Sequence, residues 1–536
     1  FFTNSLTMAS MLENLKSLSL SELQISGGDD RLVLDPKTGC NKYNTPNRPR
    51  PEAICRSSTT SNVVSLRGYN AASAVLASLL TSSSDAMLQD TFQNSMDDVR
   101  SRISACYQLP QHIDVALAPS GSDAEFLPLL VALSRRPAGG TLNIVTAAGE
   151  VGSGTANACR GCHFSSLLPS GVASKNGAPS ALPGSGTEFM QTKEVLLRQA
   201  GGGLRPASDI ESEVELLVKV AVDEGRIALL HIVAGSKTGA TTPSETFVRE
   251  LQHRVGAEKM LVIVDACQGR VKERKVGEWL HEGWQVLITG SKFFGAPPFC
   301  GAVLMQEAQM QGLDSMSVEF QALGDYFDKA CLSAAARDMQ SSQFLPERMN
   351  YGLLLRWSAA LIEMECFYST DEAHRSRIMQ QWVQGAKALV ESHGESCGHL
   401  KLALQGEADK EGMVLGGVNS LLGFEVLVLD AEDSRQKKPL NVDELKKLHA
   451  LMPRDLRLSL SHTTREISAE DVAILKRPCY IGQPVKLSAD VCVIRFAADA
   501  PLVNNICTSK DAATALQSAL ADDEILVKKL VLIAQF

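Results

Sequence analysis

The sequence contains no uninterrupted apolar run near the ~20 residues that a membrane-spanning helix needs, so we expect no membrane span. It also lacks a stripe of lysine and arginine with interleaved aromatic residues. The 61 acidic residues outnumber the 52 basic ones and give a net charge of -9. This balance argues against nucleic acid as a partner.

Features of an exported protein are also missing. There is no N-x-S/T sequon, and the first twenty residues lack the charged start, apolar core and cleavage site of a secretory signal. The 13 cysteines are scattered, and a chain of 536 residues with 44% hydrophobic residues can bury a core without disulfides. We therefore expect a cytoplasmic protein with reduced thiols and, at ~100–200 residues per domain, about two to four domains.

Turn-forming residues dominate the first part of the chain, so we predict an N-terminal arm over residues 1–65. From residue 66 two helical patterns come first, and apolar strand-like runs then alternate with further helical patterns. The strand-like runs are residues 113–119, 142–148, 227–234, 259–266, 285–290 and 301–305. This alternation predicts an α/β domain over residues 66–330, a three-layer sandwich around a mainly parallel sheet.

The second half of the chain has a different pattern. Long helical runs, two strand-like runs and a terminal helix predict an interdomain helix and a smaller α+β domain over residues 331–536. Within the first domain, the Gly/Pro/Ser-rich residues 167–186 predict an inserted surface loop.

Two charged residues follow neighbouring strands of the predicted sheet. Asp265 ends the run LVIVDA, and Lys292 follows QVLITG. Either alone is most simply a turn aspartate or an outward-pointing lysine. Upstream, the turn Ser120 to Asp123 opens a helix, and its free N–H groups and hydroxyls suit a phosphate. A phosphate cradle, a carboxylate and a lysine are together what a pyridoxal phosphate enzyme needs.

The segments VDACQGR (264–270) and VLITGSKFFGAPPFCGAVLM (286–305) carry a more specific resemblance. They are similar to the core of fold-type I pyridoxal phosphate enzymes, above all class V aminotransferases and cysteine desulfurases, which have D-x-x-Q followed by S-x-H-K. The resemblance implies that Asp265 meets the pyridine nitrogen and Gln268 the ring hydroxyl. It also implies that Lys292 forms the Schiff base and moves protons.

Further binding residues are implied by the same resemblance. For the cofactor phosphate they are Gly121, Ser122, Asp123, Thr289 and Ser291. Ser236, in HIVAGSKTGATTP, would approach the ring, and Arg348, in ERMNYG, would reach the phosphate of the second subunit of a homodimer. Arg495, in VCVIRF, would grip the substrate carboxylate, for which a planar guanidinium is suited.

The sequence departs from the desulfurase pattern. The sulfur-accepting cysteine would lie two residues before the Gln483–Pro484 pair, but that position holds Ile481 and the nearest thiol is Cys479. A persulfide mechanism needs a thiolate at the substrate sulfur, so the sequence argues against a desulfurase. The ring-stacking histidine is also missing from GEVGSGT (149–155), where Glu150 or Val151 takes its place, and Ser291 replaces the histidine before the lysine.

Three other motifs have simpler interpretations. CRGCH (159–163) matches a haem-attachment pattern or half a zinc site, but no export signal and no second C-x-x-C accompany it. GSKTG (235–239) lacks the remainder of a nucleotide-binding loop. His231, inside an apolar strand, is interpreted as a core residue and not as a metal ligand.

The sequence therefore predicts a homodimeric, cytoplasmic pyridoxal phosphate enzyme that acts on a small α-amino acid, with an aminotransferase as the first choice. A lyase for C–S cleavage or another β-elimination would use the same residues. Outside enzymes, the alternative is a relative that has lost catalysis and serves as a binding or scaffold subunit.

Overall fold

The computed structural model describes residues 10–403, 412–430, 436–457 and 468–535. Its larger sheet consists of β2 (Ile113–Ala118), β3 (Thr141–Ala148), β4 (Met190–Leu196), β5 (Ile227–Ala234), β6 (Thr241–Thr242), β7 (Met260–Asp265), β8 (Gln285–Thr289) and β9 (Gly301–Gln306). The order is β2-β9-β8-β7-β5-β3-β4, with β6 paired to β5. Pairing is parallel from β8 to β4, whereas β9 is antiparallel to both neighbours. The predicted mainly parallel sheet is confirmed.

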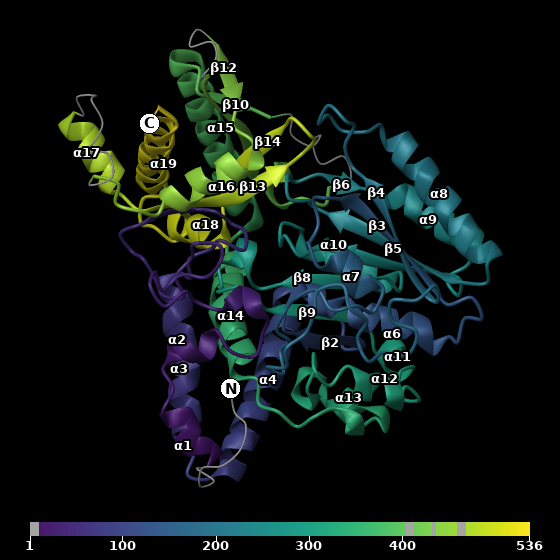
Figure 1. Ribbon diagram of the computed structural model, residues 1–536. Helices are drawn as coiled ribbons and strands as arrows, with labels where there is room; N and C mark the ends of the chain where they lie inside the picture. Colours follow the sequence, from purple (N-terminus) through teal and green to yellow (C-terminus); the bar gives the residue numbers. More distant parts are fainter. Residues whose placement is uncertain (1–9, 404–411, 431–435, 458–467, 536) are drawn as a thin grey trace.

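Helices pack on both faces of this sheet (Figure 1). The helices of this part of the chain, some of which pack on other helices, are α3 (Leu66–Leu80), α4 (Asp85–Cys106), α5 (Gly121–Ala124), α6 (Phe126–Ser134), α7 (Thr155–Cys159), α8 (Ala207–Asp223), α9 (Glu245–Val255), α10 (Glu273–His281), α11 (Glu307–Gln311), α12 (Ser317–Ala322) and α13 (Ala334–Arg337). Strands covered on both faces must be apolar throughout, and all eight residues of β5 are buried. The edge strand β4 is partly exposed and polar, so its sequence does not predict it.

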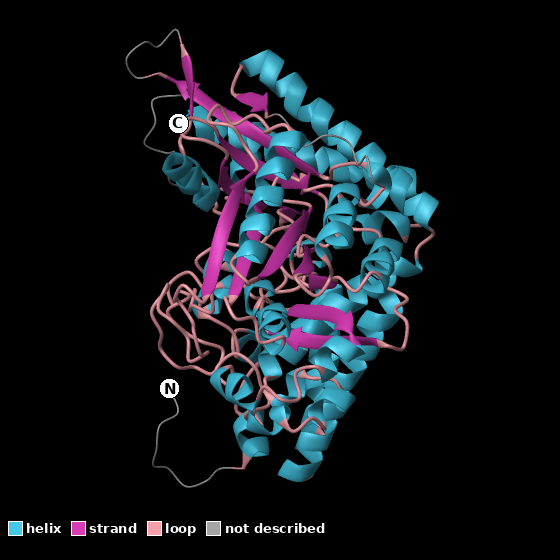
Figure 2. Ribbon diagram, turned by 90° about the vertical axis from the view of Figure 1, so that its right-hand side faces the viewer, coloured by secondary structure: helices cyan, strands magenta, loops and turns pink. Residues whose placement is uncertain are grey.

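Two long helices, α14 (Tyr351–Ser369) and α15 (Glu372–Cys397), lead from the large domain to a smaller one. The smaller sheet has the order β1-β13-β14-β11-β10, with β12 paired to β11. Its strands are β1 (Ile54–Arg56), β10 (Leu400–Leu402), β11 (Leu421–Leu429), β12 (Lys437–Pro439), β13 (Cys479–Lys486) and β14 (Cys492–Ala497). Its helices are α16 (Val442–Leu451), α17 (Ala469–Lys476), α18 (Ala500–Cys507) and α19 (Ala512–Gln535). Figure 2 shows the strands of the two sheets and the helices that pack against them.

The N-terminal segment is more ordered than an extended arm. It forms α1 (Met11–Lys16) and α2 (Leu20–Gln24), each begun by a serine and a glutamate that cap one another's backbone N–H groups. Apolar residues of both helices are buried in the core of the large domain, beside α3 (Figure 1). Further along, β1 pairs parallel to β13, so the segment joins both domains.

Two further features bear on the sequence predictions. Residues 167–186 contain no helix or ladder strand, only isolated bridges, as expected of an inserted loop. Within the described ranges, no helix is long and apolar enough to cross a membrane.

Candidate functional site

A cavity with about 900 Å³ of empty space, including its solvent-open mouth, lies where the parallel strands of the large sheet end. Its walls come from the turns after β2, β3, β5, β7 and β8, from the N-terminal segment, and from two residues within β13 and β14 of the smaller domain. The carboxyl ends of parallel strands are the usual place for ligands in such sheets. Eight of the predicted site residues line it: Gly121, Ser122, Asp265, Gln268, Thr289, Ser291, Lys292 and Arg495.

Asp265 is the last residue of β7 and opens a tight turn. Its carboxylate accepts the backbone N–H of Cys267 at 3.0 Å, which fixes the carboxylate at the cavity wall. Cys267 and Gln268 follow and also face the cavity. Burial, followed by the charge of Asp265, holds the pKa of the Cys267 thiol well above its usual range. This thiol is therefore neutral, and the sequence analysis did not identify it as part of the site.

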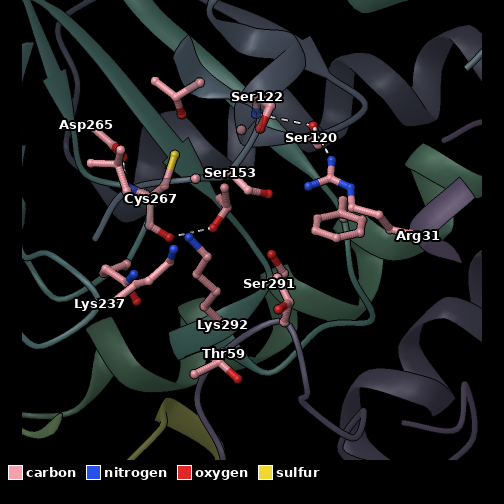
Figure 3. Close-up of a pocket in the computed structure, with 18 of the residues that line it drawn as sticks. Arg31, Thr59, Ser120, Ser122, Ser153, Lys237, Asp265, Cys267, Ser291 and Lys292 are labelled. Atoms are coloured by element: carbon pink, nitrogen blue, oxygen red, sulfur yellow. Dashed lines mark hydrogen bonds between the residues drawn. The ribbon is translucent and has the colours of Figure 1, made fainter. Parts of the chain in front are cut away.

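Lys292 stands in the turn after β8. Its φ of 57° lies in the left-handed region, which non-glycine residues adopt rarely, and it is the one residue of this kind in the described ranges that lines the cavity. The side-chain amide of Asn62 donates to its carbonyl and holds this conformation. Thr289, at the end of β8, donates to the carbonyl of Cys267 at 2.9 Å and so joins the two turns. Figure 3 shows the side chain of Lys292 extending into the cavity between Asp265 and Ser291.

The turn after β2 differs in one detail from the prediction of free N–H groups. The hydroxyl of Ser120 accepts the N–H groups of Ser122 and Asp123, both at 3.2 Å, because Ser120 is the N-cap of α5. A Cβ added at Gly121 would lie 2.8 Å from the sulfur of Cys267, so only glycine fits where this turn approaches β7. The hydroxyls of Ser120 and Ser122 lie on the cavity side in Figure 3.

Three predicted residues do not line the cavity. The first, Asp123, is 1% exposed and packs behind the turn, where burial, then the charge of Asp29, raises its pKa to about 7. Ser236 is the second. Its hydroxyl donates to the carboxylate of Glu150 at 2.6 Å and is turned away from the cavity. Its neighbour Lys237 lines the wall instead.

Arg348 is the third. Its guanidinium donates to the carbonyls of Gly324 and Phe327 at 2.5 and 3.3 Å, and it is not among the residues that line the cavity. It therefore takes no part in the cavity of its own chain. Its expected contact with a second subunit stays a prediction.

Arg495 reaches the cavity from β14 of the smaller domain. It lies opposite Gly482 of β13, and a register irregularity before Val485 turns the Gln483 carbonyl toward its guanidinium. Arg495 donates to that carbonyl at 3.0 Å and to the carbonyl of Lys237 at 3.2 Å. Burial lowers its pKa to about 10, and it is 3% exposed. The Q-P motif thus positions this arginine at the domain boundary.

The N-terminal segment contributes residues that the sequence analysis missed. Arg31, Tyr43, Thr59 and Thr60 all line the cavity. Arg31 pairs with Asp29, lies 4.0 Å above the ring of Phe299, and donates to Ser120 at 3.4 Å (Figure 3). The position of Arg31 depends on the packing of α1 and α2 against the large domain, and no sequence motif predicts this contact.

Beneath the cavity lies a buried polar cluster of Glu125, Cys159 and His231. One side-chain atom of each lies within 4.8 Å of the others. Burial lowers the pKa of His231 to about 4 and raises that of Glu125 well above its usual range. His231 also contacts the side chain of Asn143 at 3.0 Å. A neutral histidine beside a neutral carboxylic acid agrees with the interpretation of His231 as a core residue.

The thiols of the other motifs are unreactive in this fold. Cys479 is buried on β13, outside the cavity, and burial raises its pKa to about 11. Cys159 and Cys162 of the CRGCH motif are both buried and free, and burial raises the pKa of each. The raised pKa values disfavour the nucleophilic thiolate that a persulfide carrier needs at all three positions.

No family model and no curated protein matches the chain. Among solved structures it is similar to the glutamate decarboxylase domain of diaminobutyrate-pyruvate transaminase and L-2,4-diaminobutyrate decarboxylase from Vibrio parahaemolyticus, with 11% identity, a TM-score of 0.48, and 88% and 80% of the two chains covered. It is also similar to Oryza sativa TDC with PLP, with 12% identity, a TM-score of 0.47, and 90% and 84% of the two chains covered. A third similar structure is ureidoglycine-glyoxylate aminotransferase from Bacillus subtilis, with 13% identity, a TM-score of 0.46, and 88% and 98% of the two chains covered. At such identities and scores these likenesses assign no reaction to this chain.

Proposed function

We propose that this cavity binds pyridoxal 5′-phosphate and that the protein is an enzyme acting on an α-amino acid, most simply an aminotransferase. One observation carries the proposal. A lysine with a strained backbone, a strand-end carboxylate and a serine-glycine-serine turn, far apart in sequence, surround one cavity: Lys292, Asp265 and Ser120–Ser122. These are the groups that a pyridoxal phosphate enzyme needs for attachment, ring protonation and phosphate binding.

The residues present fit this cofactor. The Ser291 hydroxyl and the Gln268 side-chain oxygen are buried without hydrogen-bond partners, at the positions predicted to meet the phosphate and the ring hydroxyl. Such orphaned atoms are costly unless a ligand satisfies them. Gly121 keeps the turn close to β7, beside the cavity.

When bound, the cofactor would withdraw electrons from the bonds of the substrate α-carbon. Lys292 would hold it covalently and, once displaced by the substrate amine, would accept and return the α-proton. Asp265, fixed by the Cys267 N–H group, would keep a proton on the ring nitrogen. Arg495 would orient the substrate carboxylate.

Cofactor binding is tested by absorbance and by borohydride reduction. The purified chain loaded with pyridoxal phosphate should absorb in the visible range, and reduction should add the cofactor mass to the peptide that contains Lys292. Lys292→Ala should lose the label, whereas Lys219→Ala, on the exposed face of α8, should keep it. A wild-type chain without label would refute the proposal and would favour the non-catalytic binding subunit.

The reaction type is tested with a panel of amino acids. Accumulation of pyridoxamine phosphate and a keto acid supports transamination. Release of carbon dioxide, or of ammonia or sulfide without an acceptor, would replace the aminotransferase by a decarboxylase or a β-elimination lyase.

The proposed homodimer is tested by light scattering. Arg348→Ala is expected to weaken cofactor affinity only if the arginine reaches a second subunit.

A further inference from the structure

Besides Lys292, the cavity wall holds two cations that form no ion pair with an acidic side chain among the described residues, Lys237 and Arg495. Throughout the described ranges, no ion pair includes either side chain. The ammonium of Lys237 donates to the carbonyl of Gly149 at 3.3 Å, and both hydrogen bonds of Arg495 go to carbonyls. Dipoles alone compensate the buried charge of Arg495 poorly, and the ammonium of the half-buried Lys237 is open to the cavity, so both groups can receive anions.

The other charged groups of the cavity are accounted for. Arg31 is paired with Asp29, and Lys292, which forms no ion pair among the described residues, is the residue proposed to hold the cofactor. Burial raises the pKa of the Glu125 carboxyl well above its usual range, which disfavours its charged form.

Glu150 approaches Arg495 but does not neutralise it. Its carboxylate forms a buried ion pair with Arg198 and accepts hydroxyl hydrogen bonds from Ser236 and Thr238. These contacts of Glu150 hold the loop that carries Lys237. Burial, then the charges of Arg495 and Lys292, lowers the pKa of Lys237 to about 8, so it keeps its proton at neutral pH.

The two cations are neighbours, because the Arg495 guanidinium contacts the Lys237 backbone. Figure 3 places Lys237 on the opposite side of Lys292 from Arg31, Ser120 and Ser122. Lys237 thus lies away from the turn proposed for the cofactor phosphate, and Arg495 lines the same cavity. An α-amino acid has one carboxylate, which Arg495 would take.

We propose that the substrate is an amino acid whose side chain ends in a second acidic group, and that Lys237 binds this group while Arg495 binds the α-carboxylate. This substrate class rests on the proposed function, but the anion site itself exists in the chain without cofactor. A dicarboxylic amino acid and a phosphorylated one share the required chemistry, and the experiment separates them.

The first experiment uses the full chain without cofactor. Isothermal titration with glutarate and with butyrate should show glutarate binding at least about tenfold more tightly, the effect of one added charge-assisted hydrogen bond. Lys237→Met should remove this preference and leave butyrate affinity within about twofold. Arg495→Gln should weaken both ligands, and Lys219→Met on α8 should change neither.

Three results would overturn the proposal. The first is equal affinity of the wild type for glutarate and butyrate, and the second is a preference for glutarate that survives in Lys237→Met. The third is equal weakening of both ligands by Lys237→Met, which would mean that both cations bind one carboxylate. If the Met variant misfolds, Lys237→Arg, which keeps the charge, should retain the preference, and its loss there would count against the proposal.

The second experiment uses the cofactor-loaded chain and follows absorbance changes with glutamate, O-phosphoserine and norvaline. Half-saturation should be at least about tenfold lower for one acidic amino acid than for norvaline, and the better of the two identifies the acidic group. Equal values for all three would refute the substrate class. A chain that binds no cofactor but prefers glutarate would refute the proposed function and leave the anion site standing.

Discussion

The buried ion pair between Arg198 and Glu150 should be the main support of the loop that carries Lys237. Their side chains are 4% and 3% exposed, and Arg198 also donates to the hydroxyl of Thr238 and to the carbonyl of Gly202, both at 2.8 Å. Arg198→Met would leave the carboxylate of Glu150 buried without its countercharge. Removing one partner of such a pair costs about 3–5 kcal/mol in the free energy of unfolding.

Replacing both charges should lower the free energy of unfolding less than Arg198→Met alone. In Glu150→Gln/Arg198→Met, no charge is buried, and the glutamine oxygen still accepts from the loop hydroxyls. The double variant should therefore be at least ~1 kcal/mol more stable than Arg198→Met alone, since neighbours in one network couple by about 0.5–3 kcal/mol.

Urea unfolding followed by tryptophan fluorescence measures these free energies, because Trp279 and Trp284 are buried in the large domain. The exposed pair Lys219–Asp223 offers a control, and Lys219→Met should change stability by at most ~0.5 kcal/mol. If Arg198→Met also stays within that limit, or if the double variant is no more stable than the single one, the ion pair does not support the loop.

Two other predictions concern stability. Gly290→Ala should lower the free energy of unfolding by about 1–3 kcal/mol, because the added Cβ would lie 2.5 Å from that of Ala360. Gly277→Ala should raise it by about 0.4–1 kcal/mol, because a Cβ at this position of α10 meets nothing within 4 Å. Urea midpoints in the opposite order would contradict this packing. Burial lowers the pKa of His449 to about 4, so the unfolded chain takes up the proton first as the pH falls below the usual 6.5. Stability should fall by up to about 3 kcal/mol between pH 6.5 and 4, and His449→Gln should flatten that decline in urea midpoints measured against pH; an unchanged slope would exclude His449 as its source.

The sequence by itself determined the strands of the large sheet and the turns that follow them. Strands covered on both faces are continuous apolar runs, so β5 and β7 were predictable, and the polar residues that interrupt such runs mark strand ends. Asp265 and Lys292 were found in this way, because parallel strands bring their carboxyl ends to one edge. The polar edge strand β4 carries no such signal.

Only the tertiary structure decided which side chains face the cavity and what partners they have. Ser236 and Lys237 are neighbours in one loop, yet the hydroxyl is held by Glu150 while the ammonium lines the cavity. Arg31 enters from a segment whose turn-rich sequence predicts no site, because helices packed far from the cavity bring it there. Local patterns record burial and turns, whereas the compensation of one charge by another depends on contacts between distant parts of the chain.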